Sequence, residues 1–316
     1  MSISNEKVKL DEVLKFLFST SKKVLVNLLN GIFQENYSSD EVKLSVSNNE
    51  FVMDTFDTLR GDVFFDILNS ESDKISYHLE FQTLNDSTMI IRMFEYGFKK
   101  AKELAGNNND FKTIYFPKQK VIFFEENKNI RDIIKLKLVF PTGDDFIYSV
   151  PVMKYWEYTD KDLIENKMYP LLPLQLFKLR KELEISRRKN DIGKIKELSI
   201  KAKEIASIIA NESKELFKKD EIVGEDFHKM LLAIQNLVEY LNRNYFNDEN
   251  LEEEVITMTK TLYDPEVEKK GEKKKAIEIA KNLLDILDNE TIAVKTGLEL
   301  EEVIKLRNAM QTKVSN

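Results

Sequence analysis

The chain has 316 residues, of which 42% are hydrophobic and 33% charged, so it can form one large or two ordinary domains with a strongly charged surface. It has no cysteine, which excludes disulfides, thiolate nucleophiles and cysteine-ligated zinc. The net charge of −7 argues against a surface coated with nucleic acid, although a local basic groove remains compatible with it.

No apolar run reaches the roughly 18 residues that a membrane span requires. The first residues, "MSISNEKVKLDEV", lack the apolar core of a signal peptide. We therefore expect a soluble, cytoplasmic protein that has no membrane partner.

Residues 10–35 predict helices, because apolar residues recur at helical spacing from Leu10 to Phe18 and again from Val24 to Ile32. The sequence Ser-Thr-Ser at 19–21 can cap the second of these helices. Residues 36–50 are polar and predict a loop with a weak strand.

Residues 51–155 have the composition of an α/β domain. β-Branched and aromatic residues predict five strands, at 62–68, 75–83, 120–125, 134–140 and 146–156. Between the second and third of these, a helix is predicted to start at Asn85 or Asp86. Its expected apolar stripe consists of Met89, Ile90, Met93, Phe94, Phe98 and Ala101.

Strand signals fade after Trp156, and the rest of the chain predicts helices. The charged stretch "YDPEVEKKGEKKK" (263–275) is typical of a linker or a frayed helix. We therefore predict a domain at 1–155, a helical region at 156–262 and a small helical module at 276–316.

The strand "YHLEFQT" (77–83) carries Glu80 and Gln82, which share one face because strand side chains alternate. Asp62 opens the preceding strand. In an antiparallel hairpin the numbers of paired residues have a constant sum, and paired residues point the same way. A sum of 143 would pair Asp62 with Phe81, on the other face. A sum of 142 or 144 would place Asp62 beside Glu80 or Gln82, and the sequence leaves this register open.

Two neighbouring carboxylates repel each other, and a divalent cation relieves that repulsion. Magnesium prefers hard oxygen ligands, and it can activate water and neutralise charge that develops on phosphorus. Gln82 could orient the attacking water or hold a phosphate oxygen. The competing interpretation is an ordinary half-exposed strand face, of which a Glu-x-Gln pair is a weak indicator.

The segment "LRGDVFFDILNSESDKISYHLEFQTLNDSTMIIRMFEYGFKKAKEL" resembles the core of the PD-(D/E)XK nuclease superfamily. It is more closely similar to the recombination-promoting nucleases, a transposase-like group. In that group an aspartate begins one core strand, a Glu-x-Gln lies on the next, and a helix with arginine and tyrosine follows. The matching residues here are Asp62, Glu80, Gln82, Arg92 and Tyr96.

The resemblance covers roughly residues 10–155 and includes the opening helix, where Asp11 and Lys15 match. It implies a restriction-endonuclease-like mixed sheet flanked by helices, followed here by an all-helical C-terminal region. The activity it implies is Mg²⁺- or Mn²⁺-dependent endonuclease cleavage of double-stranded DNA, as in DNA recombination. The implied metal ligands are Asp62, Glu80 and the backbone carbonyl of Phe81.

The same resemblance makes Gln82 a catalytic residue and makes Asp11, Lys15, Arg92 and Tyr96 accessory candidates. Gln82 departs from the superfamily, most of which has lysine there. The alternative is therefore a catalytically inactive nuclease-fold protein that acts as an interaction or scaffold module.

The C-terminal "DNETIAVKTGLELEEVIKLR" (288–307) resembles a small helix-turn-helix, with Gly297 at the turn. Its second helix begins with "ELEE", which would repel a DNA backbone. A packing or homo-oligomerisation module fits this segment as well as a DNA reader does. The basic clusters "KLRK" (178–181) and "RRK" (187–189) are interleaved with glutamates and read as a charged helix face or as phosphate contacts.

Overall fold

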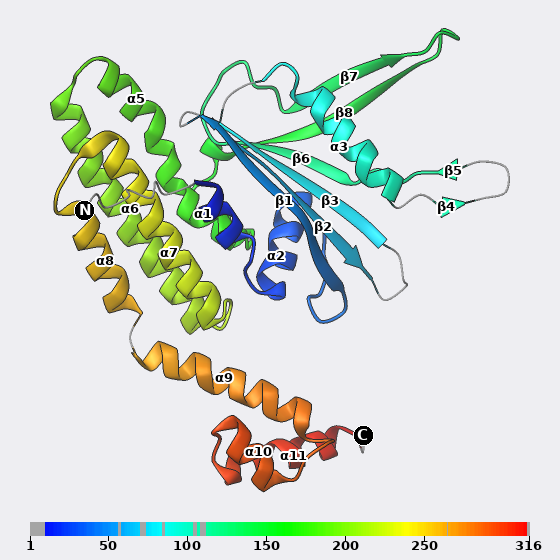
Figure 1. The fold of residues 1–316 in the computed structure, drawn as a ribbon, viewed down its shortest axis with the longest axis vertical. Coiled ribbons are helices and arrows are strands. Elements are labelled where there is room, and N and C mark those ends of the chain that lie inside the picture. The colour runs from blue at the N-terminus through cyan, green and yellow to red at the C-terminus, as the bar shows by residue number, and fades with distance from the viewer. Residues whose placement is uncertain are drawn as a thin grey trace, which may run out of the picture.

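The structure is a computed structural model that describes residues 10–55, 58–69, 74–83, 86–103, 106–107, 112–263 and 265–314. It is an α/β fold with a mixed six-stranded sheet and a mostly helical C-terminal part (Figure 1). Within these residues, no helix combines the length and the apolar character needed to cross a bilayer.

The six-stranded sheet has the order β1-β2-β3-β6-β8-β7. The first three strands pair antiparallel, β6 and β8 continue parallel to β3, and β7 folds back antiparallel on β8. A separate two-stranded pair, β4 and β5, follows the helix that comes after β3. The strands are β1 (Lys43–Thr55), β2 (Thr58–Leu68), β3 (Lys74–Gln82), β4 (Gly106–Asn107), β5 (Lys112–Thr113), β6 (Lys118–Phe123), β7 (Ile133–Val139) and β8 (Asp145–Lys154).

Helices precede the sheet, cross it once and make up the C-terminal part. The α-helices are α1 (Leu10–Leu17), α2 (Lys22–Phe33), α3 (Met89–Glu103), α4 (Asp160–Glu165), α5 (Arg180–Arg188), α6 (Ile192–Lys218), α7 (Gly224–Leu241), α8 (Leu251–Leu262), α9 (Pro265–Leu283), α10 (Asn289–Thr296) and α11 (Leu300–Val314). Shorter helical turns are η1 (Tyr155–Glu157), η2 (Tyr169–Leu179) and η3 (Asn242–Phe246). The described residues from 160 onward contain no strand, as predicted.

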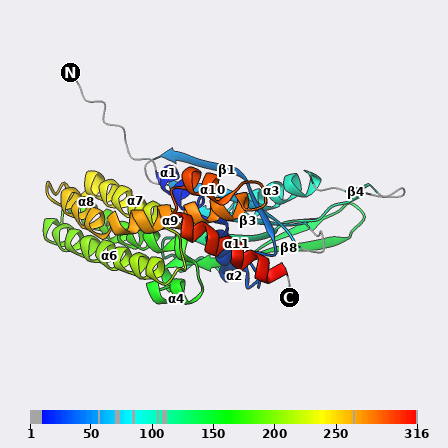
Figure 2. The same ribbon diagram turned by 90° about the horizontal axis from the view of Figure 1, so that it is seen from below.

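The two faces of the sheet are covered by different helices, as both ribbon views show (Figures 1 and 2). One face shares a continuous buried cluster with α1, α2 and the helices after residue 160; this cluster runs from Val13 to Val255 and includes Leu79 and Phe81. On the other face, α3 packs on the sheet through Met89 and Met93. The residues on either side of the predicted boundary at 155 thus share one core, and the division at 155 stays a prediction.

The C-terminal helices have a separate small core, made of Ala280, Leu284, Ile292, Leu298 and Val303. The helices α10 and α11 contain the two helices that the sequence predicts around Gly297. Gly297 ends α10 with φ +70°, a left-handed conformation that favours glycine. The predicted helix-turn-helix geometry is therefore present, whereas its function stays a prediction.

The predicted serine cap is wrong in its detail. Ser21 occupies the N-cap position of α2, but its side chain makes no bond to that helix. Instead, the backbone N–H and the Oγ of Ser21 both donate to the carboxylate of Asp226 on α7, each at 2.6 Å. A carboxylate accepts both donors at once, so Ser21 links the opening helices to the C-terminal helices.

The apolar stripe predicted for α3 also differs from the observed one. Phe98 is exposed, whereas Gly97 and Lys100 are buried. The reason is the sheet beneath, which presents a buried Asp66 to the ammonium group of Lys100 at 3.1 Å. The inner face of α3 is therefore partly charged.

Candidate active site

The pairing of β2 with β3 decides the register that the sequence leaves open. Asp62 lies opposite Glu80, which corresponds to a sum of 142. Opposed residues of an antiparallel pair point to the same face. The two carboxylates therefore share one face of adjacent strands, as the metal-site hypothesis requires.

Glu80 is buried, with 2% of its surface exposed, and its Oε1 accepts two hydrogen bonds. One comes from Gln82 Nε2 at 3.0 Å and the other from Arg92 Nη2. The other end of the guanidinium, Arg92 Nη1, lies 3.2 Å from Asp86 Oδ2. Arg92 thus bridges Glu80 to an aspartate just before α3.

Burial raises the pKa of Glu80 to about 7, because a buried carboxylate loses its hydration. Arg92 and the Gln82 hydrogen bond oppose this rise in pKa, and the negative charge of Asp62 adds to it. The Asp62–Glu80 pair therefore carries an electrostatic repulsion that Arg92 only partly offsets.

His78 shares the face of Glu80 but is held as a neutral ring. Burial and the Arg92 charge lower its pKa to about 3, and its ring stacks on Phe64 with centroids 4.2 Å apart. Its Nδ1 lies 2.9 Å from Gln119 Nε2. Its Nε2 has no hydrogen-bond partner among the described residues and lies 3.9 Å from Glu80 Oε2. His78 thus acts as a packed structural residue.

Of the accessory candidates on α3, Arg92 and Tyr96 lie against β3. Tyr96 makes an edge-to-face contact with the His78 ring at 6.0 Å. Lys99, which the spacing places on the same face, is exposed instead. Asp11 and Lys15 belong to α1, but their side chains lie outside the described part of the structure, so their role stays a prediction.

Phe81 points its side chain into the opposite core, 5.0 Å from the Phe18 ring and 6.0 Å from the Phe124 ring between centroids. Only its backbone is thus placed between Glu80 and Gln82 in β3. This is the part of Phe81 that the family resemblance assigns to a metal.

Sequence reasoning missed a second polar group on the same face, made of Asp66, Ser76 and Lys100. The Asp66 carboxylate accepts hydrogen bonds from Ser76 Oγ at 2.5 Å and from Lys100 Nζ at 3.1 Å, and all three side chains are buried. The alternation from Asp62 to Asp66 along β2 was the available signal.

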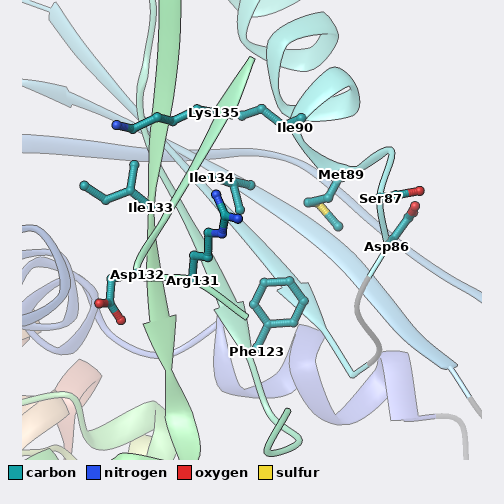
Figure 3. Close-up of a pocket in the computed structure, with 10 residues that line it drawn as sticks. All are labelled: Asp86, Ser87, Met89, Ile90, Phe123, Arg131, Asp132, Ile133, Ile134 and Lys135. Carbon is teal, nitrogen blue, oxygen red and sulfur yellow. The ribbon is translucent and has the colours of Figure 1, made fainter. Parts of the chain in front are cut away.

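A cleft of about 520 Å³ lies beside the carboxylate pair (Figure 3). Asp86, which holds Arg92, lines this cleft, whereas Asp62 and Glu80 do not. The lining residues are Asp86, Ser87, Met89, Ile90, Phe123, Arg131, Asp132, Ile133, Ile134 and Lys135.

A second cleft, of about 430 Å³, contains members of both basic clusters, Lys181 and Arg188. Arg180, between them in sequence, is buried and forms ion pairs with Glu125 at 3.1 Å and Glu184 at 3.0 Å. This arginine therefore joins α5 to the segment after β6.

The oxygen donors available at the carboxylate pair suit a magnesium or manganese ion. They are the carboxylates of Asp62 and Glu80 and the carbonyl of Phe81, and magnesium commonly takes one or two carboxylates and completes its shell with water. The described residues contain no group of three or more His, Asp or Glu that could hold a metal ion by themselves. The repulsion within the pair is the feature that a cation would relieve.

The fold and the site together define an α/β protein with a paired, buried acidic site on a mixed sheet. Comparison with family models, with curated proteins and with solved structures gives no match for this chain. The assignment of function therefore depends on the geometry of the site and on the resemblance of its motifs.

Proposed function

We propose that the chain is a metal-dependent DNA endonuclease of the recombination-promoting kind, built on a restriction-endonuclease-like fold. The observation that carries this proposal is the pairing of Asp62 with Glu80 on adjacent strands, with Gln82 and Arg92 bound to the Glu80 carboxylate. Carboxylates from two neighbouring strands are what hydrolysis of a phosphodiester with a bound cation requires.

Each residue of the site has a role in this proposal. Asp62, Glu80 and the carbonyl of Phe81 would hold Mg²⁺ or Mn²⁺, which supplies an activated water and positive charge when bound. Gln82 fixes the orientation of Glu80 through its hydrogen bond at 3.0 Å. Arg92 keeps positive charge close to the position where a phosphate would lie.

The topology supports the restriction-endonuclease-like part of the proposal. Three antiparallel strands lead into α3, which crosses to the parallel strand β6. The acidic pair lies on the face that α3 covers, so that helix residues and strand residues meet at one site.

The test is cleavage of supercoiled plasmid by the purified full chain with Mg²⁺, Mn²⁺ or EDTA. We expect nicking with either metal and none with EDTA. Glu80→Ala and Asp62→Ala should each lower the rate by more than about 100-fold, the upper range for losing only an outer-shell partner. The exposed Glu95 on α3 supplies the control Glu95→Ala, which should cleave like the wild type.

Gln82 tests the role of the departure from the superfamily. Gln82→Ala removes one hydrogen bond, and a loss of roughly 5- to 150-fold in rate is expected. Gln82→Lys restores the commoner residue and should keep or raise activity. Equal rates for wild type and Glu80→Ala would assign the cleavage to another site or to a contaminant.

The catalytically inactive interaction module is the second candidate, and the position of Arg92 favours it. The guanidinium already lies on Glu80, where it competes with any cation. Titration with Mn²⁺, followed by electron paramagnetic resonance, separates the two candidates. Failure to bind Mn²⁺ together with failure to cleave would support the interaction module. The exposed Ile286 and Val294 support the related proposal that the C-terminal helices mediate homo-oligomerisation.

A further inference from the structure

The cleft beside the carboxylate pair carries a net positive charge from side chains that the site itself does not use. Its lining includes two acidic residues, and each has a cation of its own. Asp132 Oδ1 lies 2.6 Å from Lys154 Nζ, and Asp86 Oδ2 lies 3.2 Å from Arg92 Nη1. Both of these cations lie outside the set of lining residues.

The cations of the lining, Arg131 and Lys135, are left without such compensation. Both are exposed, and neither forms an ion pair or side-chain hydrogen bond within the part of the chain that the structure describes. Figure 3 shows the guanidinium of Arg131 among the lining side chains, between Ile134 and Met89, whereas Lys135 extends outward from the rim. Because the acids are neutralised, these two charges favour an anionic ligand.

The position of the cleft relates this ligand to the candidate active site. Phe123 ends β6 and Asp86 follows β3, so the cleft lies at the carboxyl ends of two parallel strands, where open α/β sheets bind ligands. A single side chain, Arg92, separates Asp86 from Glu80. An anion in the cleft is therefore a direct neighbour of the carboxylate pair.

The floor of the cleft indicates which kind of anion fits. It is built from Met89, Phe123 and Ile134, which offer no donors or acceptors to a base edge. A ligand held there by charge alone would be read for its phosphates and not for its sequence.

We propose that this cleft binds the phosphate backbone of the DNA strand that reaches the carboxylate pair, with Arg131 as the phosphate ligand and Lys135 as a second contact at the rim. This inference rests on the proposed function, since it takes DNA as the substrate. Arg131 positions the strand and takes no part in bond cleavage.

The test is the fluorescence anisotropy of a short labelled DNA duplex with the full chain in EDTA, so that binding is measured without cleavage. Each lost phosphate contact removes about 0.9 from the slope of log K against log salt, which corresponds to about eightfold in affinity at 0.1 M salt. We expect this loss for Arg131→Gln and about twice this change in slope for the Arg131→Gln/Lys135→Gln double variant. Arg131→Lys keeps the charge and should restore most of the affinity.

Two further variants make the result specific to this cleft. Lys161→Gln removes an exposed charge on α4 and should bind like the wild type. Arg188→Gln removes a charge from the second cleft, and its side chain is 81% exposed. Since all these side chains are exposed, the variants should keep the melting temperature of the wild type.

The inference is overturned if Arg131→Gln and the double variant bind DNA like the wild type, if Arg188→Gln alone weakens binding, or if the wild type does not bind the duplex. Plasmid cleavage by the same variants separates this inference from the proposed function. A wild type that binds through Arg131 but cleaves with no metal would remove the nuclease and keep the cleft. A wild type that cleaves while Arg131→Gln binds normally would do the reverse.

Discussion

At the residue scale, the polar face beneath α3 joins two separate charge groups, and the Asp66 group is the better satisfied. Burial alone would raise the pKa of Asp66. The hydrogen bonds from Ser76 and Lys100 outweigh burial and hold this pKa below its usual 3.8. A lowered pKa in the folded state stabilises the fold above the unfolded pKa, and this stabilisation is lost as the pH falls through the lowered value.

Asp66→Asn tests this group. The change leaves Lys100 buried and paired only with the half-exposed Glu103 at 3.5 Å, so we expect a loss of about 3 kcal/mol in the free energy of unfolding at pH 7. The difference between wild type and variant should shrink below about pH 4, because the wild-type carboxylate is then protonated as well. Urea denaturation at several pH values measures both effects.

The matched control is the double variant Asp66→Asn/Lys100→Met, which removes the buried positive charge too. It should recover part of the lost stability. A single variant as stable as the wild type at pH 7 would show that the pair contributes nothing measurable.

The sequence allowed Asp62, Glu80 and Gln82 to be placed on one face only if the hairpin register was even, and that condition holds in the structure. It did not reveal Lys100, because lysine in an amphipathic pattern is ordinarily assigned to the solvent side. The assignment reverses only when the partner, Asp66, is known to lie on the sheet beneath.

At the element scale, α2 is held against the segment after α4 by a close approach at Gly31. A Cβ atom at Gly31 would lie 2.3 Å from the backbone carbonyl oxygen of Asn166 and 2.7 Å from Met168 Cγ. The backbone cannot move aside as a flexible side chain could. This glycine therefore sets the distance between the two elements.

Gly31→Ala should destabilise the protein by at least about 1 kcal/mol, because overpacking of this kind exceeds the gain in helix propensity. The exposed Lys22 in the same helix supplies the control Lys22→Ala, which should be neutral or slightly stabilising. Thermal unfolding followed by circular dichroism compares the two. A Gly31→Ala protein that melts at or above the wild-type temperature would mean that the helices separate at little cost.

Elements with strong periodicity were predicted well, and those with polar composition were not. The polar residues before 50 form the first half of β1, a 13-residue strand at the edge of the sheet. An edge strand has one neighbour only, so its composition is weakly constrained. Of the two alternatives for 263–275, the helical one is observed, because α9 runs without interruption from Pro265 to Leu283.

At the scale of the whole molecule, the sheet cannot bury its larger face without the helices that follow residue 160. Leu79, Phe81 and Phe124 belong to the same buried cluster as Phe177, Leu237 and Val255. The local sequence pattern identifies each of these residues as apolar, but it does not show which elements share a core. That is why the boundary at 155 could be drawn from composition and yet does not mark a gap in packing.

Truncated chains test this dependence. Residues 1–263 keep the whole cluster, so they should unfold cooperatively within about 5 °C of the full chain, since loss of a separately packed module costs the main core little. Residues 1–155 would expose an extensive apolar face and should aggregate. Size-exclusion chromatography and calorimetry measure both. A soluble, cooperatively folding 1–155 fragment would contradict the shared core.

The bond between Ser21 and Asp226 has a consequence for the timing of folding during synthesis. The two residues are 205 positions apart, and ribosomes add roughly 5–20 residues per second. The opening helices and the sheet therefore wait on the order of 10–40 s before α7 emerges to cover them. During that interval the nascent chain presents an apolar sheet face to its surroundings, which makes it a natural client for chaperones at the ribosome exit.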